Sequence, residues 1–259
     1  MRIAALMPLL LVTVGCMSKD ITDKPSPLTP LNDTGVTVCM SSEWMQEPCD
    51  ATDRPGQDGQ LGRDAEASLS KQGAGAAGFD FTKLSADGAA LEEQLAVWSE
   101  DGENMAWSCA RDNVTGLVWE VKSGDNRSRH YGGHTYTWYQ PAMANGDVAG
   151  VVDGGVCVGT ACDTAAFAAE ANAGALCGQS NWRLPTVSEL LSIADQSRAN
   201  PPLDTDIFPN SAFNAHWTSQ TVAFDPDFAW YVYFTAAGNG IINKSNVAHI
   251  RLVSGEALQ

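Results

Sequence analysis

The sequence predicts an α+β domain that is braced by disulfides and contains two short helices and many short antiparallel strands. Three observations support this prediction. Two local patterns mark the starts of helices, apolar and polar residues alternate strongly near the C-terminus, and an even number of cysteines follows residue 16. Helices and strands that occupy separate stretches of the chain are typical of the α+β class. At 259 residues, the chain is long enough to bury a sizeable core.

The two predicted helices have recognisable first residues. Thr186 and Glu189 form a capping-box pattern, in which the threonine hydroxyl accepts a hydrogen bond from the Glu189 amide and the glutamate reaches back. Pro185 precedes this pattern, and an apolar stripe follows it. A second helix is predicted over residues 163–176, with Asp163 as its N-terminal cap and Gly178 just past its end.

The clearest predicted strand lies near the C-terminus. Trp230, Val232 and Phe234 alternate with Tyr231 and Tyr233, so the two sets face opposite sides of a strand. We expect the first set to face the core, and the two tyrosines to be accessible.

The residues after this strand predict a hairpin. Gly238-Asn239-Gly240 is typical of a turn between neighbouring antiparallel strands. Residues 248–253 then alternate again, with Ile250 and Arg251 on opposite faces. Shorter strands are predicted around residues 117–119 and 135–138.

The first fifteen residues have the pattern of an export signal. Arg2 supplies the positive charge, residues 3–14 the apolar stretch, and Gly15 the small residue before Cys16. The arrangement resembles the lipobox of bacterial lipoproteins, which implies that Cys16 becomes the acylated first residue. An ordinary secretory peptide cut nearby is the alternative. We expect a lipid-anchored protein of the bacterial cell envelope, at the outer membrane because Met17 is not aspartate.

Six cysteines remain when Cys16 carries lipid. An even number in an exported chain predicts three disulfides, for which fifteen pairings are possible. Proximity in the sequence favours Cys39–Cys49 and Cys157–Cys162, which leaves Cys109–Cys177 as a long-range link. No CxxC pair or cluster of cysteine and histidine is present, so a zinc site is not expected.

The formal net charge of −16 argues against nucleic acid as a partner. Most of the acidic excess lies before residue 105. We divide the chain into a signal peptide (1–15), a flexible tether (16–38), an acidic and partly irregular lead-in with a cysteine-closed loop (39–104), and a C-terminal domain (105–255). Within the lead-in we expect at most one short helix, around residues 88–98.

Several pieces of the C-terminal domain resemble a known family. They are residues 109–120 (CARDNVTGLVWE), 176–178 (LCG), 181–186 (NWRLPT), 189–191 (ELL), 217–219 (WTS), 229–232 (AWYV) and 251–253 (RLV). Together they resemble the Lcl C-terminal domain family, firmly over residues 105–255 and loosely over 55–104. The resemblance implies a C-type-lectin-like fold related to formylglycine-generating enzymes, and a role as an exported binding module.

The family is named after a bacterial collagen-like adhesin, and two properties of that adhesin are not expected in this chain. Its adhesion to sulfated glycosaminoglycans depends on a basic surface, whereas this domain is acidic. Its collagen-like stalk is absent here, so the oligomeric state stays open. The expected ligand is an unknown glycan or protein.

We expect the ligand to bind a surface near the C-terminus, where tyrosines supply area and short polar side chains supply directional hydrogen bonds. Its predicted residues are Tyr231, Tyr233, Asn239, Asn243, Ser245, Asn246 and His249. In family members whose genes are diversified by diversity-generating retroelements, the amino-acid sequence of this segment is the part that varies. The alternatives are a structural envelope or pilus-associated component, and an enzyme of the formylglycine-generating type.

Other candidate residues are better explained by structure. Trp119, Trp182, Leu184 and Trp230 are expected in the core, and Arg183 in a buried pair.

No cofactor, metal or catalytic residue is predicted. Two glycines lie between His130 and His134, which indicates a loop and not a helical metal site. The acidic stretch at residues 145–163 lacks the ligand spacing of a calcium loop. No nucleophile elbow or phosphate-binding loop is present, and the formylglycine enzymes need free paired cysteines.

Overall fold

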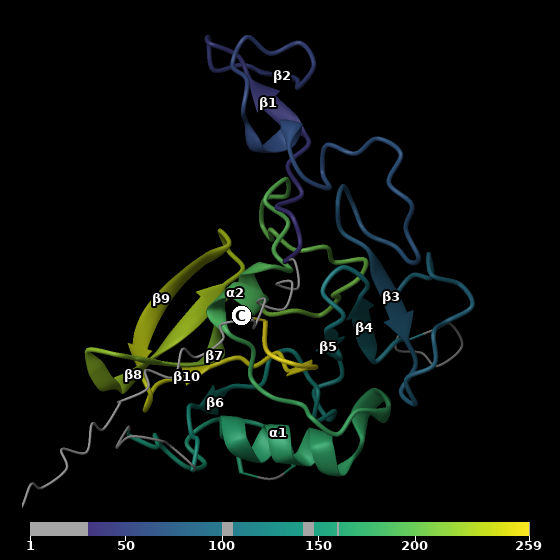
Figure 1. Ribbon diagram of the computed structural model, residues 1–259. Helices are drawn as coiled ribbons and strands as arrows, with labels where there is room; N and C mark the ends of the chain where they lie inside the picture. The colour runs from purple at the N-terminus through teal and green to yellow at the C-terminus, as the bar shows by residue number, and fades with distance from the viewer. Residues whose placement is uncertain (1–30, 100–105, 142–147, 160, 259) are drawn as a thin grey trace, which may run out of the picture.

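The computed structural model describes residues 31–99, 106–141, 148–159 and 161–258 (Figure 1). Two α-helices, two 3-10 helices and eleven short strands are found in these residues. In chain order they are β1 (Val38–Met40), β2 (Gln46–Pro48), η1 (Asp58–Gln60), β3 (Phe81–Leu84), β4 (Cys109–Asp112), β5 (Val118–Glu120), β6 (Tyr136–Thr137), α1 (Thr164–Ala173), η2 (Leu176–Gly178), α2 (Val187–Leu191), β7 (Ala215–Val222), β8 (Asp225–Tyr233), β9 (Gly238–Asn243), β10 (Val247–Ala248) and β11 (Val253–Ser254).

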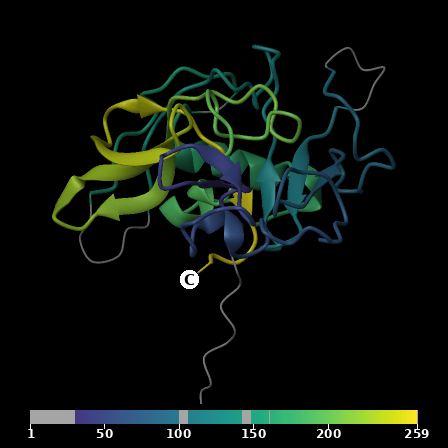
Figure 2. The same cartoon turned by 90° about the horizontal axis from the view of Figure 1, so that it is seen from above.

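The strands form four small sheets, and every pairing between named strands is antiparallel. A four-stranded sheet has the order β11-β5-β4-β3, and a three-stranded sheet has the order β7-β8-β9. The two lie at opposite sides of the molecule in both views (Figures 1 and 2). The predicted α+β class, with two short helices and short antiparallel strands, is confirmed. No described helix is both long and apolar enough to cross a membrane.

The segment before residue 105 is part of the main sheet. Strand β3 pairs with β4 in a register that places Phe81 opposite Asp112 and Leu84 opposite Cys109. Phe79 and Phe81 are fully buried in the core. Packing therefore crosses the expected boundary at residue 105. Residues 88–98, where at most one short helix was expected, form no helix.

The last part of the predicted tether packs on the domain. The Asn32 Nδ2 donates to Asp112 at 2.6 Å, and the Gly35 amide donates to Asp64 at 2.7 Å. The carbonyl of Thr34 accepts from the Gln196 amide at 2.7 Å. The prediction of a flexible tether is therefore wrong for residues 31–38, because their backbone polar groups find partners on the domain. Residues 16–30, with Cys16, lie outside the described residues.

Both helix starts are confirmed. The Asp163 carboxylate accepts from the Ala166 amide at 2.9 Å at the start of α1. Thr186 and Glu189 make both hydrogen bonds of the capping box. Helix α1 ends at Ala173, before the predicted end, because the chain turns into left-handed conformations at Ala175 and Cys177.

The three favoured disulfides are present. Cys39–Cys49 closes the β1–β2 hairpin, Cys109–Cys177 joins β4 to η2 across 68 residues, and Cys157–Cys162 closes a short loop before α1. Cys177 is fully buried, so this long-range link lies in the core beside β4.

Two clusters of buried side chains form the core. One contains Trp119 with Val232 and Phe234, and the other contains Trp182 and Leu184. The predicted core positions of Trp119, Trp182 and Leu184 are confirmed.

The core position predicted for Trp230 is wrong. This side chain is half-buried, and it belongs to neither cluster. It lies opposite Ile241 of the edge strand β9, and Ile241 is itself 37% exposed.

Candidate functional site

Two tyrosines of β8 lie across the neighbouring strand β9. Tyr231 pairs with Gly240 and Tyr233 with Gly238, and the two rings are 6.1 Å apart. A Cβ atom on Gly240 would lie 2.7 Å from the Tyr231 hydroxyl, and one on Gly238 would meet the Tyr233 hydroxyl even closer. The glycines are therefore needed so that the rings can lie flat over β9.

This arrangement corrects the predicted hairpin turn. Gly238-Asn239-Gly240 belongs to strand β9, and the turn lies at residues 234–237. The glycines look like a turn in the sequence, but they serve the tyrosines of the neighbouring strand.

The face of the three-stranded sheet that carries Tyr231 and Tyr233, here called the tyrosine face, is accessible at one end and buried at the other. Ala229 of β8 and Trp217 of β7 share this face and are fully buried in the second core cluster. Tyr231 and Tyr233 are half-buried, and their hydroxyls have no hydrogen-bond partner among the described residues. Two rings with available hydroxyls, held over a rigid sheet, are suited to ligand recognition.

The other predicted binding residues do not join the tyrosines. Asn239 is exposed, but it pairs with the buried Val232 and faces the opposite side of the sheet. Asn243 accepts from both the Ser245 amide, at 3.0 Å, and the Ser245 hydroxyl, at 2.7 Å, so these two residues hold the turn after β9. Asn246 is exposed in the same turn.

His249 is half-buried and does not lie beside the tyrosines. Its Nδ1 lies 2.9 Å from the His134 carbonyl, and its ring lies 5.6 Å from the His216 ring, on the face opposite the tyrosines. Burial lowers the pKa of His249 below its ordinary value. The prediction that His249 shares a surface with Tyr231 and Tyr233 is therefore wrong.

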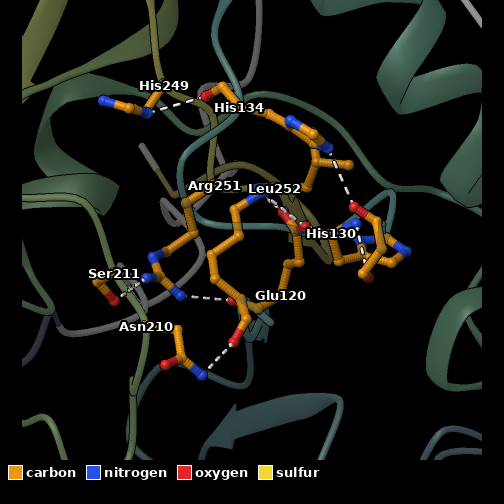
Figure 3. A network of polar contacts seen from close by, with 10 residues as sticks. Glu120, His130, His134, Asn210, Ser211, His249, Arg251 and Leu252 are labelled. Carbon is orange, nitrogen blue, oxygen red and sulfur yellow. Dashed lines mark hydrogen bonds and ion pairs between the residues drawn. The ribbon is translucent and has the colours of Figure 1, made fainter. Parts of the chain in front are cut away.

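A buried polar network lies beside the four-stranded sheet (Figure 3). The Glu120 carboxylate accepts from Lys122 at 2.7 Å and from the Leu252 amide at 3.0 Å, and it lies 2.8 Å from His130 Nδ1. Burial alone would raise the pKa of Glu120, but Lys122 and His130 lower it to about 2. Burial lowers the pKa of Lys122.

Arg251 completes this network. Its guanidinium donates to the Glu120 carbonyl and to the Ser211 hydroxyl (Figure 3). It also lies 4.9 Å from the centre of the Phe208 ring. Burial lowers the pKa of Arg251 to about 10. Asn210 donates to the Lys122 carbonyl at 3.3 Å. The network joins four separate segments, which is a structural role.

The described histidines and acidic residues that were weighed as metal ligands make other contacts, and residues 145–147 lie outside the described part of the chain. His134 Nε2 lies 3.0 Å from the Ser128 carbonyl, whereas His130 faces Glu120. Asp153 accepts from the Cys162 amide, and Asp163 caps α1.

A different acidic group has the geometry of a cation site. Asp33, Asp58 and Asp64 place one carboxylate oxygen each within 4.8 Å of the others. Burial, with the two neighbouring carboxylates, raises the pKa of Asp64, although the Gly35 and Gly78 amides donate to it. This group was not predicted from the sequence, because the spacing of its members matches no recognised metal-ligand pattern.

A pocket of about 290 Å³ lies between α1, the start of α2 and strand β7. Trp182, Arg183, Leu184 and Ser219 line it, and all four come from pieces that carry the family resemblance. The expected pair of Arg183 is present, with Glu189 at 2.7 Å. The pocket is thus a second candidate for ligand binding.

Comparison with known proteins gives one match. The family model described as the Lcl C-terminal domain matches residues 108–254, which is more than half of the chain. No curated protein and no solved structure matches. The matched segment contains the tyrosine face and all the residues that line the pocket except Ala257. The chain belongs to the Lcl C-terminal domain family.

Proposed function

We propose that the protein is a ligand-binding module of the adhesive kind, and that its ligand binds the face formed by Tyr231 and Tyr233. The observation that carries this proposal is the pair of rings spread over glycines of β9, with hydroxyls that no described residue engages. Tyrosine gives a large contact area at low entropic cost, and its hydroxyl adds a directional hydrogen bond. Membership of the Lcl C-terminal domain family supports a binding role.

We further propose a C-type-lectin-like fold and a place in the bacterial envelope, with Cys16 as the lipid anchor. Family membership supports the fold, and three disulfides are in keeping with an oxidising compartment. The Cys16→Ser variant is expected to remain unprocessed or to leave the membrane fraction. Normal processing and unchanged fractionation of that variant would refute the anchor.

An enzyme of the formylglycine-generating type is not proposed. The six cysteines after residue 16 are all joined in disulfides. Free paired thiols, which that chemistry needs, are therefore not offered by the described residues.

The experiment is a glycan and protein array probed with the full chain and with the Tyr231→Ala/Tyr233→Ala variant. We expect the variant to lose affinity by tenfold or more, since central aromatic anchors often contribute above about 1–2 kcal/mol. The matched control is Trp44→Ala, which removes an aromatic ring that is 73% exposed on the distant β1–β2 hairpin (Figure 1). Equal loss in both variants, or no loss in the tyrosine variant, would contradict the proposal.

A second candidate function is that of a structural envelope component. Trp44 and Met45 are 73% and 65% exposed at the tip of the disulfide-closed hairpin. Aromatic and methionine side chains displayed in this way are frequent at protein interfaces. Loss of array binding or of envelope association in Trp44→Ala alone would favour this candidate.

A further inference from the structure

Strand β9 is an open edge of the three-stranded sheet. All six of its residues, Gly238–Asn243, pair with β8 in an unbroken register. No strand pairs with its other side among the described residues. The backbone groups of residues 238–242 that point away from β8 likewise have no hydrogen-bond partner there. Such a row of free donors and acceptors is a template for one more strand.

The sequence of β9 does nothing to protect this edge. Edge strands are usually guarded by a charged side chain, a proline or a bulge. The strand reads GNGIIN, with no charge and no proline, and its pairing with β8 contains no bulge. Ile241 is 37% exposed on it. This edge strand is neutral, regular and partly apolar, although the chain as a whole has a net charge of −16. We take the lack of protection to indicate that the edge binds another strand.

The tyrosines extend over this edge strand. Their hydroxyls lie above Gly238 and Gly240, that is, above β9 and not above their own strand. A strand added to β9 would run about 4.8 Å further out, where its side chains would meet both phenol rings. Backbone pairing and side-chain contact would then act on the same ligand.

The surroundings of the edge are acidic. Asp225 and Asp227 stand at the start of β8, beside the end of β9 where Phe228 pairs with Asn243. The nearest cation in the sequence, Lys244, is buried and donates to the Val148 carbonyl. A ligand with positive charge at the end that approaches Asp225 and Asp227 would complement this field.

We propose that β9 accepts an extended, cationic polypeptide segment as a fourth strand, so that the ligand of the tyrosine face is a protein and not a glycan. This inference rests on the proposed function, because it names the ligand class of the same site. Strand addition supplies affinity through main-chain hydrogen bonds, and the tyrosines select the side chains.

The test uses the full chain and a synthetic peptide of alternating threonine and valine with lysine at both ends. A matched peptide carries N-methyl groups on alternate backbone amides, so it keeps the side chains and the charge but cannot pair along its edge. A third peptide has glutamate in place of lysine. Binding is measured by fluorescence anisotropy, and the amides of Gly238–Asn243 are followed by hydrogen exchange.

We expect the lysine peptide to bind and to slow amide exchange in β9. Methylation should weaken binding by about tenfold or more, because several main-chain hydrogen bonds are lost together. Asp227→Lys should weaken binding of the lysine peptide several-fold, whereas Glu43→Lys, the same charge change at an exposed site on the β1–β2 hairpin, should not.

Equal binding of the methylated peptide, unchanged exchange in β9, or no binding of the lysine peptide would overturn strand addition. Equal binding of the glutamate peptide would overturn the choice of a cationic ligand. A glycan that binds on the array and depends on Tyr231 and Tyr233 would refute this inference and leave the proposed function standing. Ligand binding that is unchanged when Tyr231 and Tyr233 are replaced by alanine would refute the proposed function itself.

Discussion

The two main sheets use polar and apolar side chains in opposite ways. Beside the four-stranded sheet, Glu120, Lys122 and Arg251 are almost completely buried. They are hydrogen-bonded to one another, to the backbone and to Ser211, and only the Arg251 Nε of this group has no partner among the described residues. In the three-stranded sheet, Tyr231 and Tyr233 are half-exposed, with no hydroxyl partner among the described residues. In the first sheet the polar side chains hold separate segments of the chain together. In the second sheet the tyrosine hydroxyls can still bind a ligand. This difference is consistent with a stabilising role for the first sheet and with the recognition role that we propose for the second.

The largest expected difference between the two sheets is in the unfolding free energy lost when one tryptophan of each is replaced by alanine. Trp119 of β5 is fully buried, so Trp119→Ala should cost about 3–5 kcal/mol of unfolding free energy. Trp230 of β8 is half-buried, so Trp230→Ala should cost about 1–2 kcal/mol. Chemical denaturation of the two variants gives both values. Equal costs would mean that β8 contributes to the core as fully as β5 does.

Removal of one buried charge should have a similarly large effect. Glu120→Ala leaves Lys122 buried without its carboxylate, and loss of one partner of such a pair costs about 3–5 kcal/mol. The matched control is Asp125→Ala, which breaks an exposed pair with Arg127 and should lower the free energy of unfolding far less, because water screens this pair. If both variants unfold at the same denaturant concentration, the network does not stabilise the first sheet.

Two of the disulfides close loops of very different length, so we expect them to contribute different amounts of stability. Replacement of Cys109 and Cys177 by serine opens a link across 68 residues and should cost about 4 kcal/mol. Replacement of Cys157 and Cys162 opens a link across 5 residues and should cost distinctly less, because closing a short loop removes less entropy from the unfolded chain. Differential scanning calorimetry under non-reducing conditions compares the pairs. A larger effect of the short loop would contradict the entropic argument.

Acid should weaken the first sheet through Glu120. The pKa of this carboxyl is lowered from 4.5 to about 2 in the folded chain, so ionised Glu120 contributes stability that is present above pH 4.5. That stability is lost as the pH falls toward 2. The stability gap between the unmodified chain and Glu120→Gln should therefore shrink by about 2–3 kcal/mol over this range. Denaturant titrations at stepped pH measure the gap, and a gap independent of pH would exclude this mechanism.

Local patterns in the sequence predicted much of the fold. The caps at Asp163 and Thr186 depend on neighbouring residues, and the disulfide pairing follows from proximity once two short loops are closed. The alternation in β8 correctly placed Val232 and the tyrosines on opposite faces. Each of these features is set within a few residues or by elimination.

The rest depended on contacts between distant segments. Arg251 is buried because Glu120 and Ser211 come from elsewhere in the chain to meet it. Gly238 and Gly240 lie in a strand because tyrosines of the neighbouring strand fill the space above them. No local pattern in the sequence indicates such neighbours, so the polar network was not predicted and the paired glycines were interpreted as a turn.

Hydrogen exchange of the full chain, with and without the ligand selected on the array, would show which sheet the ligand contacts. We expect the ligand to slow amide exchange in β8 and β9, at Asp225–Tyr233 and Gly238–Asn243, and to leave exchange in β4 and β5 unchanged. Protection centred instead on the pocket lined by Trp182 and Ser219, with β9 unaffected, would contradict the assignment of recognition to the tyrosine face.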